Sequence, residues 1–520
     1  MPHWLALALP ALPLQLAQRR FDPALARTLA LAVIDGPVQR ARVAYCNGPA
    51  AAAGIHSGMA LAAAQALSRT LITLQRDPVR ERAALHELAC WAYQFSAQIV
   101  TDARGVTEEC GPDSVLLLET GASERLFGGR VSLHRRIQRE LQQLGYEAAS
   151  ASAATPGAAR LLARARAAGR DPGESAAAAD PQQLARILGP LPHSLFHWAE
   201  PVGTRLAALG LDTIGEVLAL PRDALARRLG TDLLVDLDRA LGRCADPQPP
   251  FHPPERFSAR AEMPADIIDV ARLLPPLQRL LLLLEGFLRG HGAGATALLL
   301  TARHSPRRTL PLPHTQVPLA LAAPERDPQR LLQLYAERLA RIRLAAPVVL
   351  LELQLERMAG YIPSSGSFLP PSPHAPGAGS DILQLAELLH ARLGSEGVFQ
   401  LQARSDHRPE CAYRLLPLTP DPPRQPDTPP APAQRPLLLL PVPCPLAPPA
   451  ADHTLPAYRG ALALLAGPER IETGWWEQGP QPRAIVHRDY YVARNPRGQT
   501  VWVYRELAAP QRWFLHGFFA

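Results

Sequence analysis

The sequence predicts an α+β protein built from several domains. Its 520 residues, 47% of them hydrophobic, are enough for three or four packed domains at roughly 100–200 residues each. Strands interleaved with helices as far as residue 153 indicate a mixed layer of the two. A second mixed unit, with the order β-α-β-β-α-β, is expected between residues 257 and 356.

The first mixed region begins with an apolar segment, WLALAL at residues 4–9, which predicts a buried strand. A short helix and a second strand are expected within 23–35, and a loop leading into an Ala-rich helix within 45–67. The remaining expected elements are helices over 78–98 and 123–144 and strands over 115–119 and 147–153.

Residues 157–245 change character to short helices joined by Gly and Pro turns. Apolar residues at helical spacing predict a small helical core, which comprises Leu206, Leu209, Leu211, Ile214 and Val217. A Pro-rich joint follows at 247–254.

The second mixed unit follows this joint. We expect, in order, a strand over 257–263, a helix over 270–290, strands over 295–303 and 309–318, a helix over 327–344 and a strand over 347–356. This order is the split βαβ, ferredoxin-like arrangement.

The last third alternates linkers with small folded elements. Residues 361–380 are linker by composition, and 381–416 hold a helix and a short strand. Residues 417–450 are so rich in proline that an extended linker is expected. The last 70 residues alternate aromatic, β-branched and Arg residues, which predicts a small β-rich domain.

The charge balance permits a polyanionic partner without proving one. The formal net charge is +7, the isoelectric point is near 9.3, and all 54 basic residues are Arg. Coding bias toward GC-rich codons explains the missing Lys better than selection for the bidentate phosphate geometry of Arg. Mild basicity is a weak signal for nucleic acid.

Cysteine usage and hydropathy indicate a cytoplasmic protein. The six cysteines form no C-x-x-C pair, which argues against a zinc module or a disulfide framework. The apolar N-terminus has no basic start or cleavage site, so a strand is expected rather than a signal peptide. The apolar run near Leu280–Leu284 is broken by Glu285 and Arg289, so no membrane span is expected.

Several motifs carry a resemblance to a known family. GIHSGM (54–59), ASAATPGAARLLARA (151–165) and GLDTIGEVLALP (210–221) resemble segments of the fingers, palm-to-thumb junction and thumb of Y-family translesion DNA polymerases. LETGASERLFGG (118–129) and the ending that starts with GPERIETGWWEQG (467–479) are similar to the ImuB family, the catalytically defective Y-family relatives of bacterial mutagenesis cassettes.

The resemblance implies a domain plan. It comprises palm and fingers at 1–160, with fingers at about 36–75; a helical thumb with a degenerate helix-hairpin-helix at 161–250; a little finger at 255–358; a linker at 359–380; a small helix and strand element at 381–416; a Pro-rich linker at 417–450; and a β-rich C-terminal interaction domain at 451–520.

The metal site that the resemblance implies is degenerate. Y-family palms place an Asp in the first strand and an Asp-Glu pair before the third, whereas this chain has no acid within 4–9 and has Asp113-Ser114 at the pair. Two catalytic ions about 3.5–4 Å apart need several carboxylates. We therefore expect no catalytic residue, with Asp113 and Ser114 vestigial, no metal and no cofactor. The alternative is an active polymerase that uses Mg²⁺ in a rearranged site, to which Asp22, Glu108 or Glu109 would contribute.

The triphosphate-binding side is degenerate as well. The family offers a Tyr and an Arg before the fingers motif, and this chain has Gly48 and Ala51 there; Arg160 is the remaining basic candidate. The thumb hairpin, His197-Trp198-Ala199, lacks the glycines that let backbone amides approach a phosphate, so we expect it to be structural.

Arginines of the β-α-β-β-α-β unit are the candidates for non-sequence-specific contact with primer-template DNA. They flank its central hairpin and crowd its second helix: Arg303, Arg307, Arg308, Arg338, Arg341 and Arg343. A solvated helix face is an almost equally good explanation of the pattern.

Two regions are candidates for protein partners. Aromatic residues of the terminal domain could bind a partner, stack on bases or form a sheet core: Trp475, Trp476, Tyr490, Tyr491, Trp502 and Trp513. Phe368 and Leu369 could dock on the sliding clamp, although the usual Gln is missing; Gln384–Leu389 is a rival within a helix, and neither segment need be the site.

The combined expectation is a non-catalytic adaptor in damage-induced mutagenesis. The ImuB resemblance implies an error-prone C-family polymerase and an ImuA-type, RecA-like protein as partners of the terminal region. A plain DNA-binding repair factor without these partners is a third interpretation.

Overall fold

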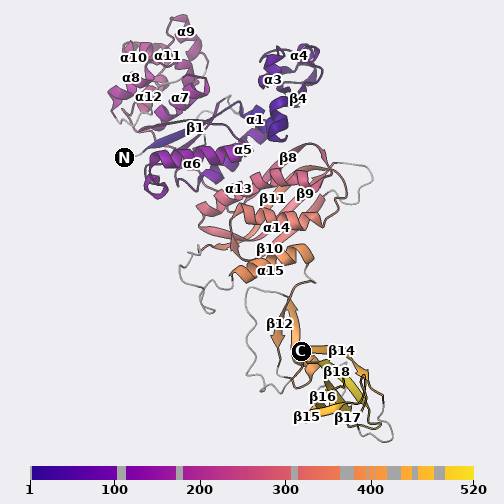
Figure 1. Ribbon diagram of the computed structural model, residues 1–520. Coiled ribbons are helices and arrows are strands. Elements are labelled where there is room, and N and C mark those ends of the chain that lie inside the picture. The colour runs from indigo at the N-terminus through magenta and orange to yellow at the C-terminus, as the bar shows by residue number, and fades with distance from the viewer. Residues whose placement is uncertain are drawn as a thin grey trace. The chain divides into compact units, whose positions relative to one another are not determined.

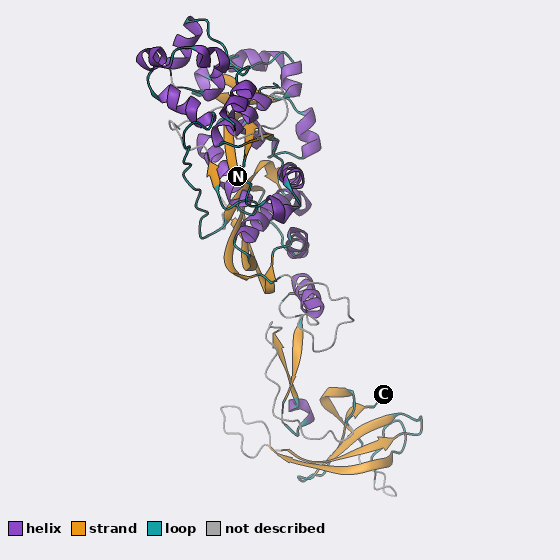
Figure 2. Ribbon diagram, turned by 90° about the vertical axis from the view of Figure 1, so that its left-hand side faces the viewer, coloured by secondary structure: helices purple, strands orange, loops and turns teal. Residues whose placement is uncertain are grey.

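The computed structural model describes residues 3–101, 113–170, 180–198, 200–305, 314–362, 380–394, 397–404, 406–417, 435–447, 455–473 and 486–519. The chain forms two compact units, residues 1–380 and 381–520, and each is described by itself. Most helices belong to the first unit, and the second is mainly strands (Figures 1 and 2). No helix among the described residues combines the length and the apolar character that crossing a membrane requires.

The first sheet of unit 1 has the strand order β5-β6-β1-β7. Its strands are β1 (Trp4–Pro10), β5 (Ile99–Thr101), β6 (Asp113–Glu119) and β7 (Ala149–Ala153), close to the predicted ranges. The central strand, β1, is buried on both faces because it is apolar throughout. Helix α7 (Pro156–Ala167) packs on the face that carries Ala6 and Ala8.

A second sheet of unit 1 has three strands, in the order β3-β2-β4. It consists of β2 (Leu31–Asp35), β3 (Arg42–Cys46) and β4 (Ile72–Gln75), with α3 (Gly48–Ala52) and α4 (Leu61–Leu67). Because β2 pairs with β3 and β4, this sheet begins at Leu31 rather than at the expected residue 36. Helix α1 (Leu12–Gln18) packs on β2 through Leu14 and Ala17.

Five short helices form the predicted helical region: α8 (Pro181–Leu188), α9 (Val202–Ala208), α10 (Ile214–Ala219), α11 (Arg222–Leu229) and α12 (Asp232–Ala240). Leu206, Ile214 and Val217 are buried in its core, as expected, and Leu211 is partly buried. The prediction for Leu209 is wrong, since its side chain is 50% exposed. Leu209 ends α9 just before Gly210, whose positive φ turns the chain away from the core.

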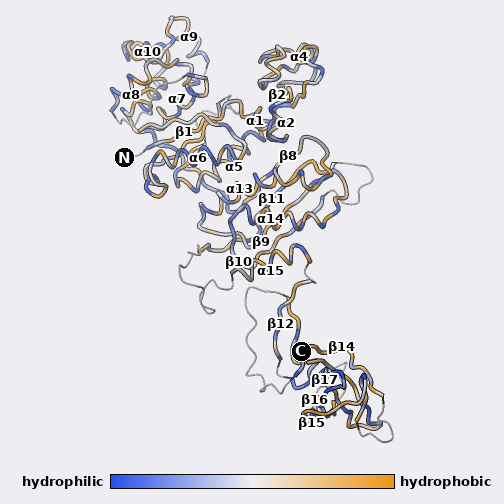
Figure 3. Tube along the Cα trace, in the orientation of Figure 1, coloured by the Kyte–Doolittle hydropathy of each residue, from blue (hydrophilic) through white to orange (hydrophobic). Residues whose placement is uncertain are grey.

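The β-α-β-β-α-β unit is confirmed, with sheet order β10-β9-β11-β8. Its elements are β8 (Ser258–Ile267), α13 (Leu274–Gly290), β9 (Ala293–His304), β10 (His314–Glu325), α14 (Pro328–Ala340) and β11 (Val348–Gly360). Figure 3 shows hydrophobic and hydrophilic positions along the strands of this unit, and burial alternates along β10, as expected for a sheet that helices cover on one face.

Helix α13 joins this unit to helix α5 (Pro78–Ala92). Two glycines permit the contact, since a Cβ added at Gly286 would lie 2.6 Å from Trp91 Cδ1 and one added at Gly290 would lie 2.8 Å from Tyr93 Cδ1. The helices therefore approach more closely than any side chain at these positions would allow.

The remaining elements of unit 1 are α2 (Pro23–Thr28), α6 (Arg130–Gln143) and the 3₁₀ turns Val38–Arg40, Glu124–Phe127, His193–Phe196 and Val270–Leu273. Helix α15 (Ser380–Leu393) follows, and unit 2 adds the hairpin β12 (Phe399–Ala403) and β13 (Tyr413–Pro417) and the 3₁₀ turn Pro409–Cys411.

Unit 2 ends in a five-stranded sheet of order β14-β18-β17-β16-β15. Its strands are β14 (Leu438–Pro445), β15 (Ala463–Thr473), β16 (Val486–Arg494), β17 (Thr500–Glu506) and β18 (Trp513–Phe518). The expectation that 417–450 is wholly linker is wrong for β14, which pairs with β18. Its Pro441, Pro443 and Pro445 are compatible with a strand because β14 is at the edge of the sheet.

Candidate functional site

The first candidate site is the end of β1 beside β6, where the acids of a polymerase would lie. The register pairs Leu9 with Ser114 and Pro10 with Asp113. The Leu9 and Ser114 side chains are buried, at 1% and 5% exposure. At this end of the two strands the structure thus places an aliphatic side chain opposite a hydroxyl, and neither residue is an acid. The Asp113 side chain lies outside what the structure describes.

Other acids do not complete the site within the described residues. Asp22 serves as the N-cap of α2, where its Oδ1 accepts a hydrogen bond from Ala24 N at 2.9 Å. Glu108 and Glu109 lie outside the described residues. Within the described ranges, no group of three or more His, Cys, Asp or Glu side chains is arranged to hold a metal ion.

The residues at the predicted triphosphate-binding positions lie on helices. Gly48 and Ala51 lie on α3, whose N-cap Asn47 accepts hydrogen bonds from Ala50 N and Leu31 N. Arg160 lies on α7 and is partly buried. The Asn47 bonds fix α3 to the start of β2, which gives this segment a structural role.

The thumb hairpin is stabilised by side chains. Trp198 stacks on Phe196 with ring centroids 4.4 Å apart, and its indole donates to Asp236 Oδ2 at 3.2 Å. His197 has a φ of 54°, and Ala199 lies outside the described residues.

A carboxylate bridged by two arginines lies on the sheet of the β-α-β-β-α-β unit. Glu352 on β11 accepts from Arg260 Nη2 of β8 at 3.0 Å and from Arg303 Nη2 of β9 at 3.1 Å. We call these three residues the Glu352 triad. Its neighbours Leu351 and Leu353 are buried on the face that contacts α13, so the triad lies on the opposite face of the sheet.

The charges of the Glu352 triad sum to +1 and remain partly in water. The Glu352 side chain is 5% exposed, whereas those of Arg260 and Arg303 are 56% and 54% exposed. Burial alone would raise the pKa of Glu352, but the hydrogen bonds from the two arginines outweigh it and keep the pKa below its usual value. The carboxylate is therefore ionised at neutral pH.

The predicted DNA-binding arginines do not form one uniform patch. Arg303 is partly neutralised in the triad, and Arg307 and Arg308 lie outside the described residues. Arg338 is half-buried and donates to Pro318 O; burial lowers its pKa. Arg338 therefore ties α14 to β10, and its role in DNA binding stays a prediction. Arg341 and Arg343 are exposed, just after α14.

The aromatic residues of unit 2 mostly form its core. Tyr490 and Trp502 are fully buried and stack with centroids 4.1 Å apart, and Trp513 is 8% exposed. The prediction that these three residues form a partner-binding surface is wrong. They are buried in two hydrophobic clusters on opposite faces of the sheet. Tyr491 is partly buried against Trp513, and Trp475 and Trp476 lie outside the described residues.

A second bridged carboxylate lies in the same sheet. Asp489 on β16 accepts from Arg470 Nε of β15 at 2.8 Å, and Arg505 Nη2 of β17 lies 3.8 Å from its Oδ2. We call this set the Asp489 triad. The hydrogen bond from Arg470 holds the pKa of Asp489 below its usual value.

The clamp-binding candidates remain predictions. Phe368 and Leu369 lie outside the described residues. The rival segment is part of α15, where Leu385 is 57% exposed and Leu389 is 38% exposed.

Sequence reasoning missed Glu352 and Arg260, although a signal was present. Glu352 interrupts the apolar run of β11 at a position that alternation assigns to one face together with Leu350 and Gln354. A lone acid in a buried strand needs a partner, and only the pairing of three strands reveals which arginines supply it.

The chain is similar to a family model and to curated proteins. Residues 14–164 match the model of the impB/mucB/samB family. Protein ImuB from each of two strains of Caulobacter vibrioides is 29% identical over 495 residues, which cover 90% of this chain and 100% of the relative.

Solved structures of DNA polymerases are also similar to part of the chain. The insertion ternary complex of Dbh DNA polymerase is 14% identical and matches 68% of this chain and 98% of its own, with a TM-score of 0.37. DinB from Sulfolobus solfataricus is 16% identical over the same shares, with a TM-score of 0.36.

Proposed function

We propose that this chain, which is similar to Protein ImuB and matches the impB/mucB/samB family model over residues 14–164, is an ImuB-like homologue of the Y-family polymerases and a non-catalytic adaptor in damage-induced mutagenesis. In this proposal it acts in the cytoplasm at the nucleoid and binds primer-template DNA without reading sequence. It recruits an error-prone C-family polymerase and an ImuA-type, RecA-like protein, and it docks on the sliding clamp.

The pairing of Leu9 with Ser114 supports the proposed loss of catalysis. Two-metal phosphoryl transfer stabilises the attacking and leaving oxygens through ions that carboxylates hold. Hard divalent ions need oxygen ligands, which the buried Leu9 side chain cannot supply. With Ser114 across the ladder, Asp113 is the one acid of the motif that remains.

Proposed DNA contacts lie on the β-α-β-β-α-β unit. The half-exposed Arg260 and Arg303 surround one carboxylate, so this face keeps a net positive charge, and Arg341 and Arg343 add two exposed cations. A few such charges bind phosphates with strong salt dependence and without base readout.

Partner binding is assigned to unit 2 on the ImuB resemblance. Its aromatic core is occupied internally, so a partner would bind the surface that this core supports. Exposed apolar side chains of unit 2 include Val442 on β14 and, on the β12–β13 hairpin, Leu401 and Leu415.

Primer extension tests the catalytic proposal. We expect no synthesis with Mg²⁺ or Mn²⁺ under conditions in which a Y-family polymerase is active. Robust synthesis by this chain that is lost in Asp113→Ala would overturn the proposal and favour a polymerase with a rearranged metal site.

DNA and partner binding are tested separately. The double variant Arg341→Gln/Arg343→Gln should weaken DNA binding several-fold and flatten its dependence on salt, whereas Arg392→Gln on α15 serves as the matched control. Deleting 436–520 should abolish co-purification with the two protein partners. If recovery of both partners is unchanged, the recruiting role of this region is wrong.

A further inference from the structure

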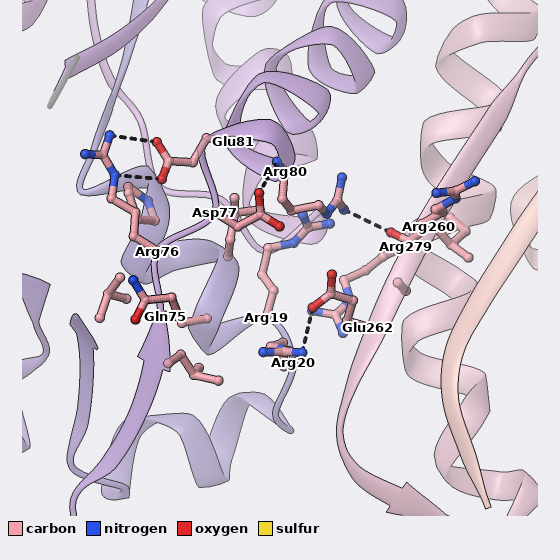
Figure 4. A pocket seen from close by; sticks show the side chains of 17 residues that line it. Arg19, Arg20, Gln75, Arg76, Asp77, Arg80, Glu81, Arg260, Glu262 and Arg279 are labelled. Carbon is pink, nitrogen blue, oxygen red and sulfur yellow. Dashed lines mark hydrogen bonds and ion pairs between the residues drawn. The ribbon is translucent and has the colours of Figure 1, made fainter. Parts of the chain in front are cut away.

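A cavity of about 400 Å³ lies in unit 1 between the two mixed regions. Its walls are the end of α1, the end of β4 with the start of α5, strand β8 and helix α13 (Figure 4). The contact between α5 and α13 holds the walls together. None of the nucleotide-binding counterparts, Gly48, Ala51 or Arg160, lines it.

The cavity combines an apolar wall with an arginine-rich rim. Leu16, Val33, Leu74 and Leu280 contribute aliphatic surface. The rim has six arginines against three carboxylates: Arg19, Arg20, Arg76, Arg80, Arg260 and Arg279 against Asp77, Glu81 and Glu262. A small-molecule site typically has this make-up, with apolar walls and a few converging polar groups.

Four of the six arginines have carboxylate partners. Arg76 donates to both oxygens of Glu81, at 2.9 and 3.1 Å, and Arg20 pairs with Glu262 at 2.6 Å. Arg80 pairs with Glu87, and Arg260 belongs to the Glu352 triad. The Arg20–Glu262 pair and a hydrogen bond from Arg80 Nη2 to Arg260 O at 3.0 Å connect different walls, and together the pairs leave little charge for a ligand.

Arg19 and Arg279 have no carboxylate within ion-pair distance among the described residues. They are close to each other, because a Cβ placed on Gly145 would lie 3.6 Å from both Arg19 Nε and Arg279 Nη1. Burial and the positive charge of Arg19 lower the pKa of Arg279 to about 10. The Arg19 guanidinium lies over the Tyr146 ring and donates from Nη1 to the Tyr146 hydroxyl, while its buried Nε has no hydrogen-bond partner.

We propose that this cavity binds a small phosphate monoester, with the phosphate between Arg19 and Arg279 and an apolar, flat body against Leu74 and Leu16. A phosphate dianion matches two guanidinium groups in charge, and it accepts the forked hydrogen bonds that Arg offers. The cavity volume suits a nucleotide-sized molecule rather than a polymer. This site goes beyond the proposed adaptor function and does not depend on it.

Thermal shift and calorimetry on the full chain test the proposal. The probes are inorganic phosphate, phenyl phosphate, dAMP, deoxyadenosine and a short single-stranded oligonucleotide, each at matched ionic strength. We expect the phosphate monoesters to bind and stabilise the protein, and deoxyadenosine to do neither. Arg279→Gln should weaken dAMP at least about tenfold, whereas the exposed-site control Arg341→Gln should leave it unchanged.

A second variant separates the two parts of the site and does not remove an arginine. Leu74→Trp fills the apolar part, so it should weaken dAMP while inorganic phosphate binds as before. The proposal is overturned if no monoester binds the parent chain, if Arg279→Gln and Arg341→Gln bind dAMP equally, or if only the oligonucleotide binds in an Arg279-dependent way.

Discussion

The Glu352 triad and the Arg19–Arg279 pair lie in the same unit and hold arginine in opposite ways. In the triad, two half-exposed guanidinium groups share one buried carboxylate. In the cavity, two guanidinium groups lie near each other without a carboxylate partner among the described residues, and burial and the charge of Arg19 lower the pKa of Arg279 to about 10. The Asp489 triad repeats the first arrangement in unit 2.

Arginines that share a buried carboxylate stabilise the fold, whereas the Arg19–Arg279 pair has no carboxylate partner and is available to a ligand. A bridged carboxylate satisfies its arginines internally, so each triad stabilises a three-stranded pairing and leaves a modest positive field. An unbridged pair costs folding free energy in the empty protein, and a bound anion would recover that cost. Substitutions in the two arrangements should therefore have opposite signs.

The largest expected effect comes from separating the cavity walls. In Gly286→Ala the new methyl group would meet Trp91 at under 3 Å, so we expect a loss of about 2–3 kcal/mol of stability in unit 1 and no phosphate monoester binding. Hydrogen exchange in α5 and α13 and calorimetry would measure both. Gly203→Ala, on α9 with nothing within 4 Å, is the matched control and should be neutral or stabilising. Unchanged binding in Gly286→Ala would show that this contact does not shape the cavity.

Asp489→Asn should cost about 2 kcal/mol in unit 2, because Arg470 loses a charged acceptor and Arg505 loses its ion-pair partner. The pKa of Asp489 is lowered in the folded protein, so its contribution is present above the unfolded pKa of about 3.9 and disappears as pH falls through the folded value. Far-ultraviolet melting curves at several pH values would measure this. The parent should lose stability below about pH 4 more steeply than the variant, and parallel curves would contradict the prediction.

Glu352→Gln should be milder, at about 1–2 kcal/mol, since water still reaches both arginines. It should also tighten DNA binding, because it raises the charge of the triad from +1 to +2. Fluorescence anisotropy over a range of salt concentrations would measure both the affinity and the steeper salt slope. Arg303→Gln is the opposite control and should weaken binding; a change in the same direction for both variants would exclude this face as a DNA contact.

Arg279→Gln should have the smallest effect and the opposite sign. Removing one charge of the unbridged pair should raise the stability of the ligand-free protein by about 1 kcal/mol. Thermal unfolding in a buffer without phosphate or sulfate would measure it. A loss of stability would mean that Arg279 has a structural partner and that the contrast with the triads is wrong.

Much of the fold could be predicted from the sequence because the pattern is local. The β-α-β-β-α-β order follows from alternation and helical periodicity within single segments, and the apolar β1 is evident from its letters. The prediction that Leu209 is buried was wrong because helical spacing does not show where a helix ends. The prediction of a linker where β14 lies was wrong because three prolines usually exclude a strand. The position of β14 at the edge of the sheet permits them.

The candidate sites also differ in whether their residues lie close together in the sequence. The absence of an acid in residues 4–9 and the Asp113-Ser114 pair can be read directly from short stretches of sequence. The Glu352 triad joins three strands that are distant in the chain, and the Arg19–Arg279 pair joins α1 to α13. Such sites depend on which strands and helices become neighbours, and no local pattern in the sequence records that.

The edge strand β14 has a consequence for how the protein behaves at high concentration. An exposed strand edge offers unpaired amides on which another chain can add a strand, and growth of this kind leads to fibres. Pro441, Pro443 and Pro445 have no N–H to offer, so this side of the sheet cannot support a continuous ladder. The β14 edge of this aromatic-rich sheet is thus protected from the addition of further strands. The high proline content, which is typical of a linker, here protects against aggregation.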